Sequence, residues 1–261
     1  MSLEIYLFCA LIGLVPSIIW LLFYLRKDSH PESKKMVTKI FVWGMVMGPL
    51  AAVLELVFHW LTKPISLREF LYPLNSPGWL SFLDLILAAP LIEEFLKYQV
   101  VRRWAIKNRE FDEPFDAMLY MIISALGFAA IENIIYLMTF PIFFSVKGVL
   151  IAAALRFLSA TFVHTLASGM LGYWLARSIF EPEKKISMLA KGFGLAIFFH
   201  SAYNYLIWLT NDLKSSLLAY LPLSMIVLII TLMAIAVFHN FSLLKEISSI
   251  CKIYRPKKSI A

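Results

Sequence analysis

Long apolar runs separated by short polar segments make up almost the whole chain. A run of about twenty apolar residues is long enough to cross a bilayer as a helix. Such runs predict seven spans, near residues 3–25, 37–61, 79–101, 116–139, 149–177, 189–210 and 217–239. Turn residues and charges gather between the spans, as in residues 26–35, 62–78 and 180–185. The pattern therefore predicts an all-α, polytopic membrane helix bundle with about seven transmembrane helices.

Composition agrees with a membrane protein of one domain. Hydrophobic residues make up 61% of the 261 residues, charged residues only 16%, and the mean hydropathy is +0.78. A soluble domain cannot keep that much apolar surface from water, so lipid must be part of the solvent. We expect one transmembrane domain over residues 1–245, with its motif-bearing core at about 40–210, followed by a basic cytoplasmic tail at 246–261.

Basic residues fall mainly on one side of the predicted spans. Of the 24 Lys and Arg residues, 18 lie on one side, within 26–39, 102–109, 177–191 and 245–258, and four lie on the other. This bias predicts that the N-terminus lies outside the cell and the C-terminus in the cytoplasm. Topology and attraction to anionic inner-leaflet lipid account for the net charge of +7, so we expect the lipid bilayer, and no nucleic acid, as a partner.

The third predicted span carries two adjacent carboxylates and a lysine. Glu93 and Lys97 are four residues apart and Glu94 and Lys97 are three apart, so one ammonium can contact either carboxylate on a helix. Charged groups within a bilayer cost roughly 2.5–3.5 kcal/mol each and usually mark function. Two carboxylates that repel each other around one lysine are typical of acid/base chemistry. The alternative is an interfacial cluster whose lysine extends to the cytoplasmic surface.

Further polar residues lie inside the next three predicted spans. Glu132 stands in an apolar stretch without a basic residue nearby on its own helix, so its partner must come from another helix. His164 lies deep in the fifth span, and His200 and Asn204 share a face of the sixth, four residues apart. A single histidine in a membrane is often only a hydrogen-bonding packing residue. Two intramembrane histidines, one of which shares a helical face with an asparagine, favour a functional site.

The helical rise places these residues at overlapping depths. At about 1.5 Å per residue, they can line one water-filled cavity, which we expect to open to the cytoplasm. We assign the other intramembrane charges to structural roles. Glu55 and His59, four residues apart, and Asp84 are expected at the outer rim, and Arg156 is expected to be a counter-ion, for instance to one of these outer acids.

Four motifs on consecutive spans together resemble a known family. They are Glu93-Glu94-x-x-Lys97, Phe128-x-x-x-Glu132, the intramembrane His164 and His200-x-x-x-Asn204. This set resembles the PrsW family of intramembrane proteases, named for a bacterial protease that cuts an anti-sigma factor and related to the type II CAAX prenyl endopeptidases. The prenyl endopeptidases carry His where Glu132 stands, which points away from cleavage of prenylated tails. The resemblance implies a multi-pass protein of a bacterial or archaeal inner or plasma membrane, with a membrane-anchored protein or peptide as substrate.

The resemblance also implies a mechanism, in which a glutamate activates water and no metal takes part. In it, Glu93 or Glu94 is the general base and is held by Lys97, while Glu132 and His164 position the water. His200 and Asn204 donate hydrogen bonds to the developing oxyanion. A zinc-dependent version ranks second, with His164, His200 and Glu132 as ligands, because the chain lacks the His-Glu-x-x-His signature.

A function of another class stays open at this point. Several spans with buried Glu, Lys and His are also typical of a proton-coupled transporter. Transport favours repeated breaks by Gly or Pro near the site, and Pro90, just before the glutamate pair, is the only such break there. The sequence indicates neither the substrate's identity nor the oligomeric state.

Overall fold

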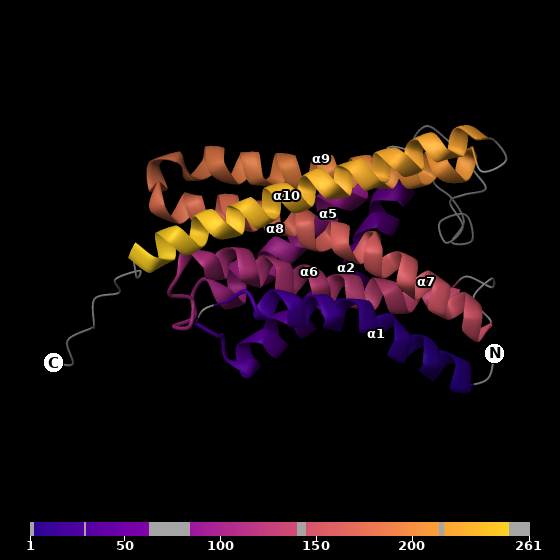
Figure 1. The fold of residues 1–261 in the computed structure, drawn as a ribbon, viewed down its shortest axis with the longest axis horizontal. Helices are drawn as coiled ribbons and strands as arrows, with labels where there is room; N and C mark the ends of the chain where they lie inside the picture. Colours follow the sequence, from indigo (N-terminus) through magenta and orange to yellow (C-terminus); the bar gives the residue numbers. More distant parts are fainter. Residues whose placement is uncertain (1–2, 29, 63–83, 140–144, 214–216, 251–261) are drawn as a thin grey trace.

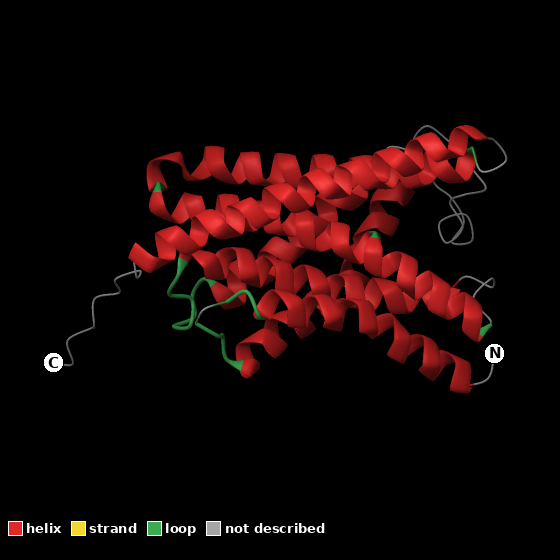
Figure 2. Ribbon diagram, in the orientation of Figure 1, coloured by secondary structure: helices red, strands yellow, loops and turns green. Residues whose placement is uncertain are grey.

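The computed structural model describes residues 3–28, 30–62, 84–139, 145–213 and 217–250, and within these ranges all regular structure is helical (Figure 2). The α-helices are α1 (Leu3–Leu25), α2 (Lys34–Thr62), α5 (Ala89–Val100), α6 (Pro114–Thr139), α7 (Val146–Leu158), α8 (Ala160–Phe180), α9 (Lys185–Asp212) and α10 (Tyr220–Ile250). Single π-helical turns, Asp84–Ala88 and Val101–Ala105, flank α5, and short 3₁₀ turns lie at Pro182–Lys184 and Leu217–Ala219.

Five helical stretches among the described residues are long and apolar enough to cross a membrane. They are Leu3–Leu25, Lys34–Leu61, Pro114–Thr139, Val146–Phe180 and Leu217–Glu246. The other two predicted spans are also helical, in α5 with its flanking turns and in α9. They fall outside the five because α5 is short, with 12 residues, and because α9 carries polar residues such as His200 and Asn204. The multi-pass helical architecture is confirmed, while the number of seven spans and the orientation stay predictions.

The helices lie side by side along the long axis of the molecule (Figure 1). α2, α6 and α9 begin at one end of the bundle, where α1, α8 and α10 finish. The connecting residues 30–33, 106–113 and 181–184 lie at this end, which we call the basic end because most Lys and Arg residues of the sequence fall in its segments. By the charge bias, the basic end is the one predicted to face the cytoplasm.

Helix α6 forms the centre of the bundle. It packs against α1, α2 and α8, and its residues from Pro114 to Ala130 are buried on every side. Two glycines let α2 and α6 approach closely: a Cβ on Gly127 would lie 2.0 Å from the Phe41 carbonyl oxygen, and one on Gly44 would lie 2.2 Å from that of Ser124. Small residues are typical of such crossings between membrane helices. The hydrophobic effect does not drive helices together in lipid, so their association depends on close packing.

The predicted fifth span is divided in the structure. Ser159, with φ −122° and ψ −90°, separates α7 from α8, although no Gly or Pro stands there. Its amide still donates to the Leu155 carbonyl at 3.0 Å, so the chain changes direction between two nearly continuous helices. The break matters for the site, because Arg156 in the last turn of α7 and His164 on α8 both contact Glu132 on α6.

Helix α5 packs against α2, α6, α8 and α9 on one side and exposes Leu91 and Phe95 on the other. Pro90 in its first turn lacks an amide N–H and would crowd the carbonyl of the preceding turn. The π turn Asp84–Ala88 comes directly before it, and wide turns of this kind are frequent at functional sites. The next turn presents Glu93, Glu94 and Lys97 to the interior of the bundle, where all three are buried.

Candidate active site

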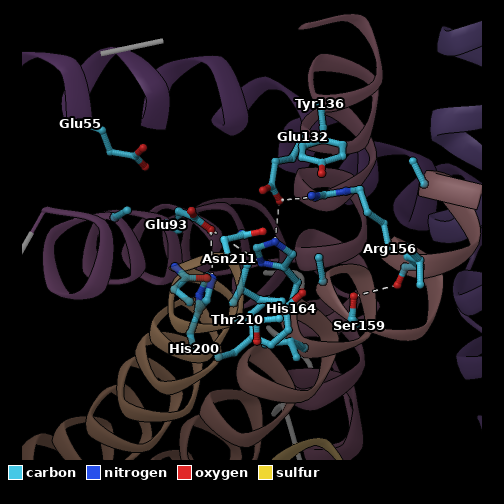
Figure 3. A pocket seen from close by; sticks show the side chains of 18 of the residues that line it. Glu55, Glu93, Glu132, Tyr136, Arg156, Ser159, His164, His200, Thr210 and Asn211 are labelled. Carbon is cyan, nitrogen blue, oxygen red and sulfur yellow. Dashed lines mark hydrogen bonds and ion pairs between the residues drawn. The ribbon is translucent and has the colours of Figure 1, made fainter. Parts of the chain in front are cut away.

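The predicted polar residues of α5, α6, α8 and α9 meet in one cluster inside the bundle. Figure 3 shows Glu93, Glu132, His164 and His200 from four different helices directed toward a shared space. The rings of His164 and His200 lie 4.9 Å apart, centroid to centroid, almost at right angles. Long-range packing of helices distant in sequence therefore assembles the motifs into a single site.

Lys97 is the centre of the cluster and is fully buried. Its Nζ lies 2.7 Å from Glu94 Oε1, 2.9 Å from His164 Nδ1 and 3.1 Å from Glu93 Oε2. An ammonium has three protons and no lone pair, so each contact uses one N–H as donor. The ring of Phe128 covers the ammonium, with its centroid 4.4 Å from Nζ. Lys97 is thus bound inside the protein and does not extend to the surface, which excludes the interfacial interpretation of this motif.

The two glutamates of the pair have different surroundings. Glu94 is fully buried, and both its oxygens accept hydrogen bonds: Oε1 from Lys97 and, at 3.2 Å, from His200 Nδ1, and Oε2 from Ser168 Oγ at 2.6 Å. Glu93 accepts from Lys97 through Oε2 alone and lines a cavity. Its Oε2 lies 3.7 Å from His164 Nδ1 and 3.9 Å from His200 Nε2. Glu94 is therefore enclosed, whereas Glu93 faces space that a substrate or water can occupy.

The hydrogen bonds assign the tautomers of the two histidines. His164 Nδ1 accepts from Lys97, so its proton is on Nε2, which donates to Glu132 Oε2 at 2.6 Å. His200 has the opposite arrangement, because its Nδ1 must donate to the Glu94 carboxylate. The other ring nitrogen of His200, Nε2, lies toward Glu93 and carries no proton when the ring is neutral.

Arg156 is the counter-ion of Glu132. Its Nη2 lies 3.2 Å from Glu132 Oε2, its Nε donates to Asn133 Oδ1, and its guanidinium lies 4.6 Å from the centroid of Tyr136. Asn133 in turn donates to Thr161 Oγ1 at 3.0 Å. The expected counter-ion role of Arg156 is confirmed, but its partner among the described residues is Glu132 and not one of the acids assigned to the outer rim. The sequence identified both charges but not their contact, because the break at Ser159 redirects the arginine.

A cavity of about 600 Å³ adjoins the cluster. Its lining includes catalytic candidates of the sequence, namely Glu93, Glu132, His164, His200 and Asn204. From the cluster it extends toward the end of the bundle opposite the basic end, as far as Asn211 in the last turn of α9 and Ala89 at the start of α5. We expected a cavity opening at the basic, cytoplasmic end, and the lining residues lie in the other half of the bundle.

Glu55 also differs from expectation. It lines the cavity together with Glu93 and Glu132 and does not lie at the outer rim. Within the described part of the chain, no hydrogen bond or ion pair joins its carboxylate to another residue, His59 included. His59 itself is buried. The side chain of Asp84 lies outside the described residues, so its expected role stays a prediction.

Comparison with known proteins agrees with this picture. The sequence profile described as PrsW family intramembrane metalloprotease matches residues 32–236, most of the chain. The chain belongs to the PrsW family. It is 30% identical to the Protease PrsW of Geobacillus kaustophilus over 75% of this chain and 77% of that protein. It is 26% identical to the Protease PrsW of Bacillus subtilis over 75% and 80%, respectively. No solved structure gives a significant match.

Membership of the PrsW family confirms an intramembrane protease in a bacterial type of cell membrane. The description of the family as metalloproteases implies a metal ion, so the arrangement of possible metal ligands in the cluster is relevant. Glu93, Glu94, His164 and His200 place one ligand atom each within 4.8 Å of one another, and histidine with carboxylate is a common zinc donor set. Glu132, which we predicted as a ligand, is not in this group.

The Lys97 ammonium already occupies the place between these donors that a metal ion would need. Its ammonium lies within 3.1 Å of three of the four donors of this PrsW site. A metal ion bound by the same atoms would stand beside a fixed positive charge at contact distance, which is strongly unfavourable in a buried site. As arranged, the four donors fit the lysine ammonium and would fit a metal only after Lys97 had moved away.

Three residues of the site are absent from the sequence prediction. Ser168 donates to Glu94, Ser124 donates to the Lys97 carbonyl at 3.1 Å, and Thr161 holds Asn133. Ser168 lies four residues after His164, on the same helical face, which is a signal that spacing alone offers. Ser124 and Thr161 carry no such signal, since buried hydroxyls are common in membrane helices.

Proposed function

We propose that this PrsW-family protein hydrolyses a peptide bond in a membrane-anchored substrate by a water that Glu93 activates. One observation carries the assignment of the base: of the two adjacent glutamates, Glu93 alone lines the cavity, while Glu94 is enclosed by three donors. A general base must be within hydrogen-bond distance of the water whose proton it takes. Glu94 then serves to fix Lys97 and His200.

The proposed reaction uses the geometry as follows. Glu93 takes a proton from a water in the cavity, and the water oxygen attacks the carbonyl carbon of the scissile bond. Glu93 then gives the proton to the nitrogen of the leaving amine as the C–N bond breaks. Lys97 keeps Glu93 oriented through one N–H. The carboxylate of Glu132, held by Arg156 and His164, lies on the same cavity and helps to position the water.

The oxyanion that forms on the scissile carbonyl requires a hydrogen-bond donor on the cavity wall opposite Glu93. Asn204 lines the cavity one helical turn after His200, and its side-chain amide supplies N–H groups for this purpose. A neutral His200 with its proton on Nδ1 cannot donate from Nε2. We therefore assign the oxyanion to Asn204, and to His200 the anchoring of Glu94. All seven residues predicted from the sequence keep a place in this scheme, with Glu94, Lys97 and His164 as positioning residues.

The shape of the cavity supports a direction of substrate entry. Because the cavity extends away from the basic end, the scissile bond is reached from the side predicted to lie outside the cytoplasm. A substrate with one membrane span and a segment outside it fits this path. As substrate class we propose an anti-sigma factor of this kind, which the family resemblance implies.

Co-expression of tagged single-span substrates with the wild type and two variants tests this function. Glu93→Gln keeps the shape of the side chain and removes the base, so cleavage should fall by on the order of 10²-fold or more. Glu183→Gln, the same change at an exposed residue between α8 and α9, should cleave like the wild type and is the matched control. Cleavage by Glu93→Gln at the wild-type rate would refute the proposal.

A zinc-dependent protease is the second candidate, because Glu93, Glu94, His164 and His200 form a zinc-type donor set once Lys97 has moved away from them. When bound by these residues, zinc would lower the pKa of a water molecule and polarise the scissile carbonyl. The two candidates differ in a measurement that does not involve activity. Elemental analysis of the purified, cleavage-competent protein after dialysis against a chelator should find less than stoichiometric zinc if Glu93 acts without metal. Stoichiometric zinc that is retained under these conditions would favour the metal enzyme.

A further inference from the structure

We infer that Glu55 determines specificity by binding a basic side chain of the substrate, a lysine or arginine, close to the scissile bond. The inference rests on the proposed protease function and concerns a residue that the hydrolytic scheme does not use. It follows from three features of the structure: the position of Glu55, its lack of a counter-ion among the described residues, and a small side pocket beside it.

Glu55 stands where two cavities meet. The large cavity and a second one of about 150 Å³ share Glu55, Glu93 and Glu132 in their linings. In Figure 3 the Glu55 side chain comes from α2 and points into the space in front of Glu93, across the site from Arg156. A substrate segment that presents its peptide bond to Glu93 therefore has Glu55 on its α2 side.

The charges of the site leave Glu55 without compensation in the part of the chain that the structure describes. Lys97 gives its three N–H groups to Glu93, Glu94 and His164. Arg156, the other cation of the site, is bound to Glu132 and Asn133. A cationic group brought by the substrate would meet a carboxyl group that has no partner among the described residues, in surroundings where water screens weakly.

The second cavity has the form of a pocket for a long basic side chain. One wall of this pocket is formed by small residues of α2, whose short side chains leave room for a ligand: Gly48, Ala51 and Ala52. The other wall is formed by the apolar side chains of Ile131 and Ile135 on α6. Lysine and arginine bury their methylene stems against apolar surface and place the charged head at a polar group. Three glutamates line this pocket, but Glu93 is already bound to Lys97 and Glu132 to Arg156. Glu55 at the α2 wall is therefore the group that can receive such a head, and a mostly apolar pocket with few polar groups is typical of a specificity site.

The test uses substrates that differ at one position. Lysine is placed in turn at each of the residues flanking the cut, with methionine at the same position as an uncharged side chain of similar length. For each pair, the ratio of kcat/KM for the Lys substrate to that for the Met substrate is measured in detergent or in vesicles. In the wild type we expect a ratio on the order of tenfold at one position, the range that a single pocket contact provides.

Variants at Glu55 should change this ratio. Glu55→Gln, which is nearly isosteric, should bring it close to one. Glu55→Lys should reverse the preference toward a substrate with glutamate at that position. Glu183→Gln is the matched control and should keep the wild-type ratio, because it lies outside both cavities. If Glu55→Gln keeps the wild-type ratio, or lowers both rates by the same factor, the inference is wrong.

Failure of the inference is distinct from failure of the proposed function. If cleavage depends on Glu93 and the Lys/Met ratio does not depend on Glu55, the protease assignment stands and only the specificity role falls. If wild type and Glu93→Gln are indistinguishable for every substrate, the proposed function fails and takes this inference with it. The near-isosteric Glu55→Gln carries the test even if Glu55→Lys does not fold.

Discussion

Lys97 Nζ lies 2.9 Å from His164 Nδ1, so the buried ammonium donates to the histidine of a different helix. This contact means that His164 cannot be a free base, because one ring nitrogen accepts from Lys97 and the other donates to Glu132. It also joins α5, α6 and α8 through one line of hydrogen bonds. The role of His164 in the proposed reaction is therefore to orient Glu132 and Lys97.

Opposite tautomers of the two site histidines are the first prediction. His164 should carry its proton on Nε2, because its Nδ1 accepts a hydrogen bond from the Lys97 ammonium. His200 should carry its proton on Nδ1, because that nitrogen donates to the Glu94 carboxylate. Nitrogen NMR of histidine-labelled protein distinguishes protonated from unprotonated ring nitrogens, and single His→Gln variants assign the signals. The same tautomer in both residues, or a doubly protonated His164, would contradict the assignment.

Removal of the Lys97 ammonium is the second prediction. Lys97→Met leaves Glu93 and Glu94 without their shared cation, and breaking a buried ion pair in this way costs about 3–5 kcal/mol of stability. It also vacates the centre of the four donors, so the variant should bind zinc and regain part of its thermal stability when zinc is added. Thermal unfolding with and without added zinc, together with metal content, measures both effects. Stoichiometric zinc in the wild type and none in Lys97→Met would overturn this account.

Much of the fold and the membership of the site follow from the sequence for a simple physical reason. Lipid forces each long apolar run into a helix, so the runs at 3–25 and 116–139 correspond closely to α1 and α6. Charged groups in such runs are costly and gather where they can pair. This is why Glu132 and His164, which have no partner on their own helices, meet in the structure at 2.6 Å.

Contacts that depend on tertiary geometry could not be predicted in this way. A residue count cannot locate the break at Ser159, which has no Gly or Pro, so the contact of Arg156 with Glu132 was missed. The depth of a residue along its helix also does not show whether its side chain faces a cavity. Glu55 was therefore assigned to the rim, although its side chain faces Glu93 across the cavity.

The close contact of α2 with α6 gives the third prediction. Gly127→Ala would place a Cβ 2.0 Å from the Phe41 carbonyl oxygen, so the two helices must separate. Overpacking of this kind costs about 1–3 kcal/mol. Gly194→Ala on α9 is the matched control, since a Cβ there meets nothing within 4 Å, and it should leave thermal unfolding in detergent nearly unchanged. Equal melting temperatures for the two variants would show that the α2–α6 contact is looser than described.

The fourth prediction concerns the residues between α1 and α2 at the basic end. Glu32 accepts a hydrogen bond from the Tyr120 hydroxyl on α6, and His30 and Ser33 contact Glu113 and Glu110. The pKa of Glu32 is raised from 4.5 to about 7, chiefly by burial and also by the negative charges of Asp28 and Glu110, while the hydrogen bonds with Tyr120 and Asp116 oppose the shift. The docked segment therefore prefers the protonated carboxyl.

The sign of the pH effect follows from this raised pKa. Below about pH 4.5 Glu32 is protonated whether the segment is docked or free, and its contribution to docking is complete. As the pH rises toward 7 and beyond, the free segment ionises more readily than the docked one, so docking weakens. Amide hydrogen exchange in residues 30–37, corrected for its intrinsic pH dependence, should show falling protection between pH 5 and 8. Glu32→Gln should flatten this dependence while Glu183→Gln keeps it. An equal slope in the two variants would show that Glu32 does not cause the pH dependence.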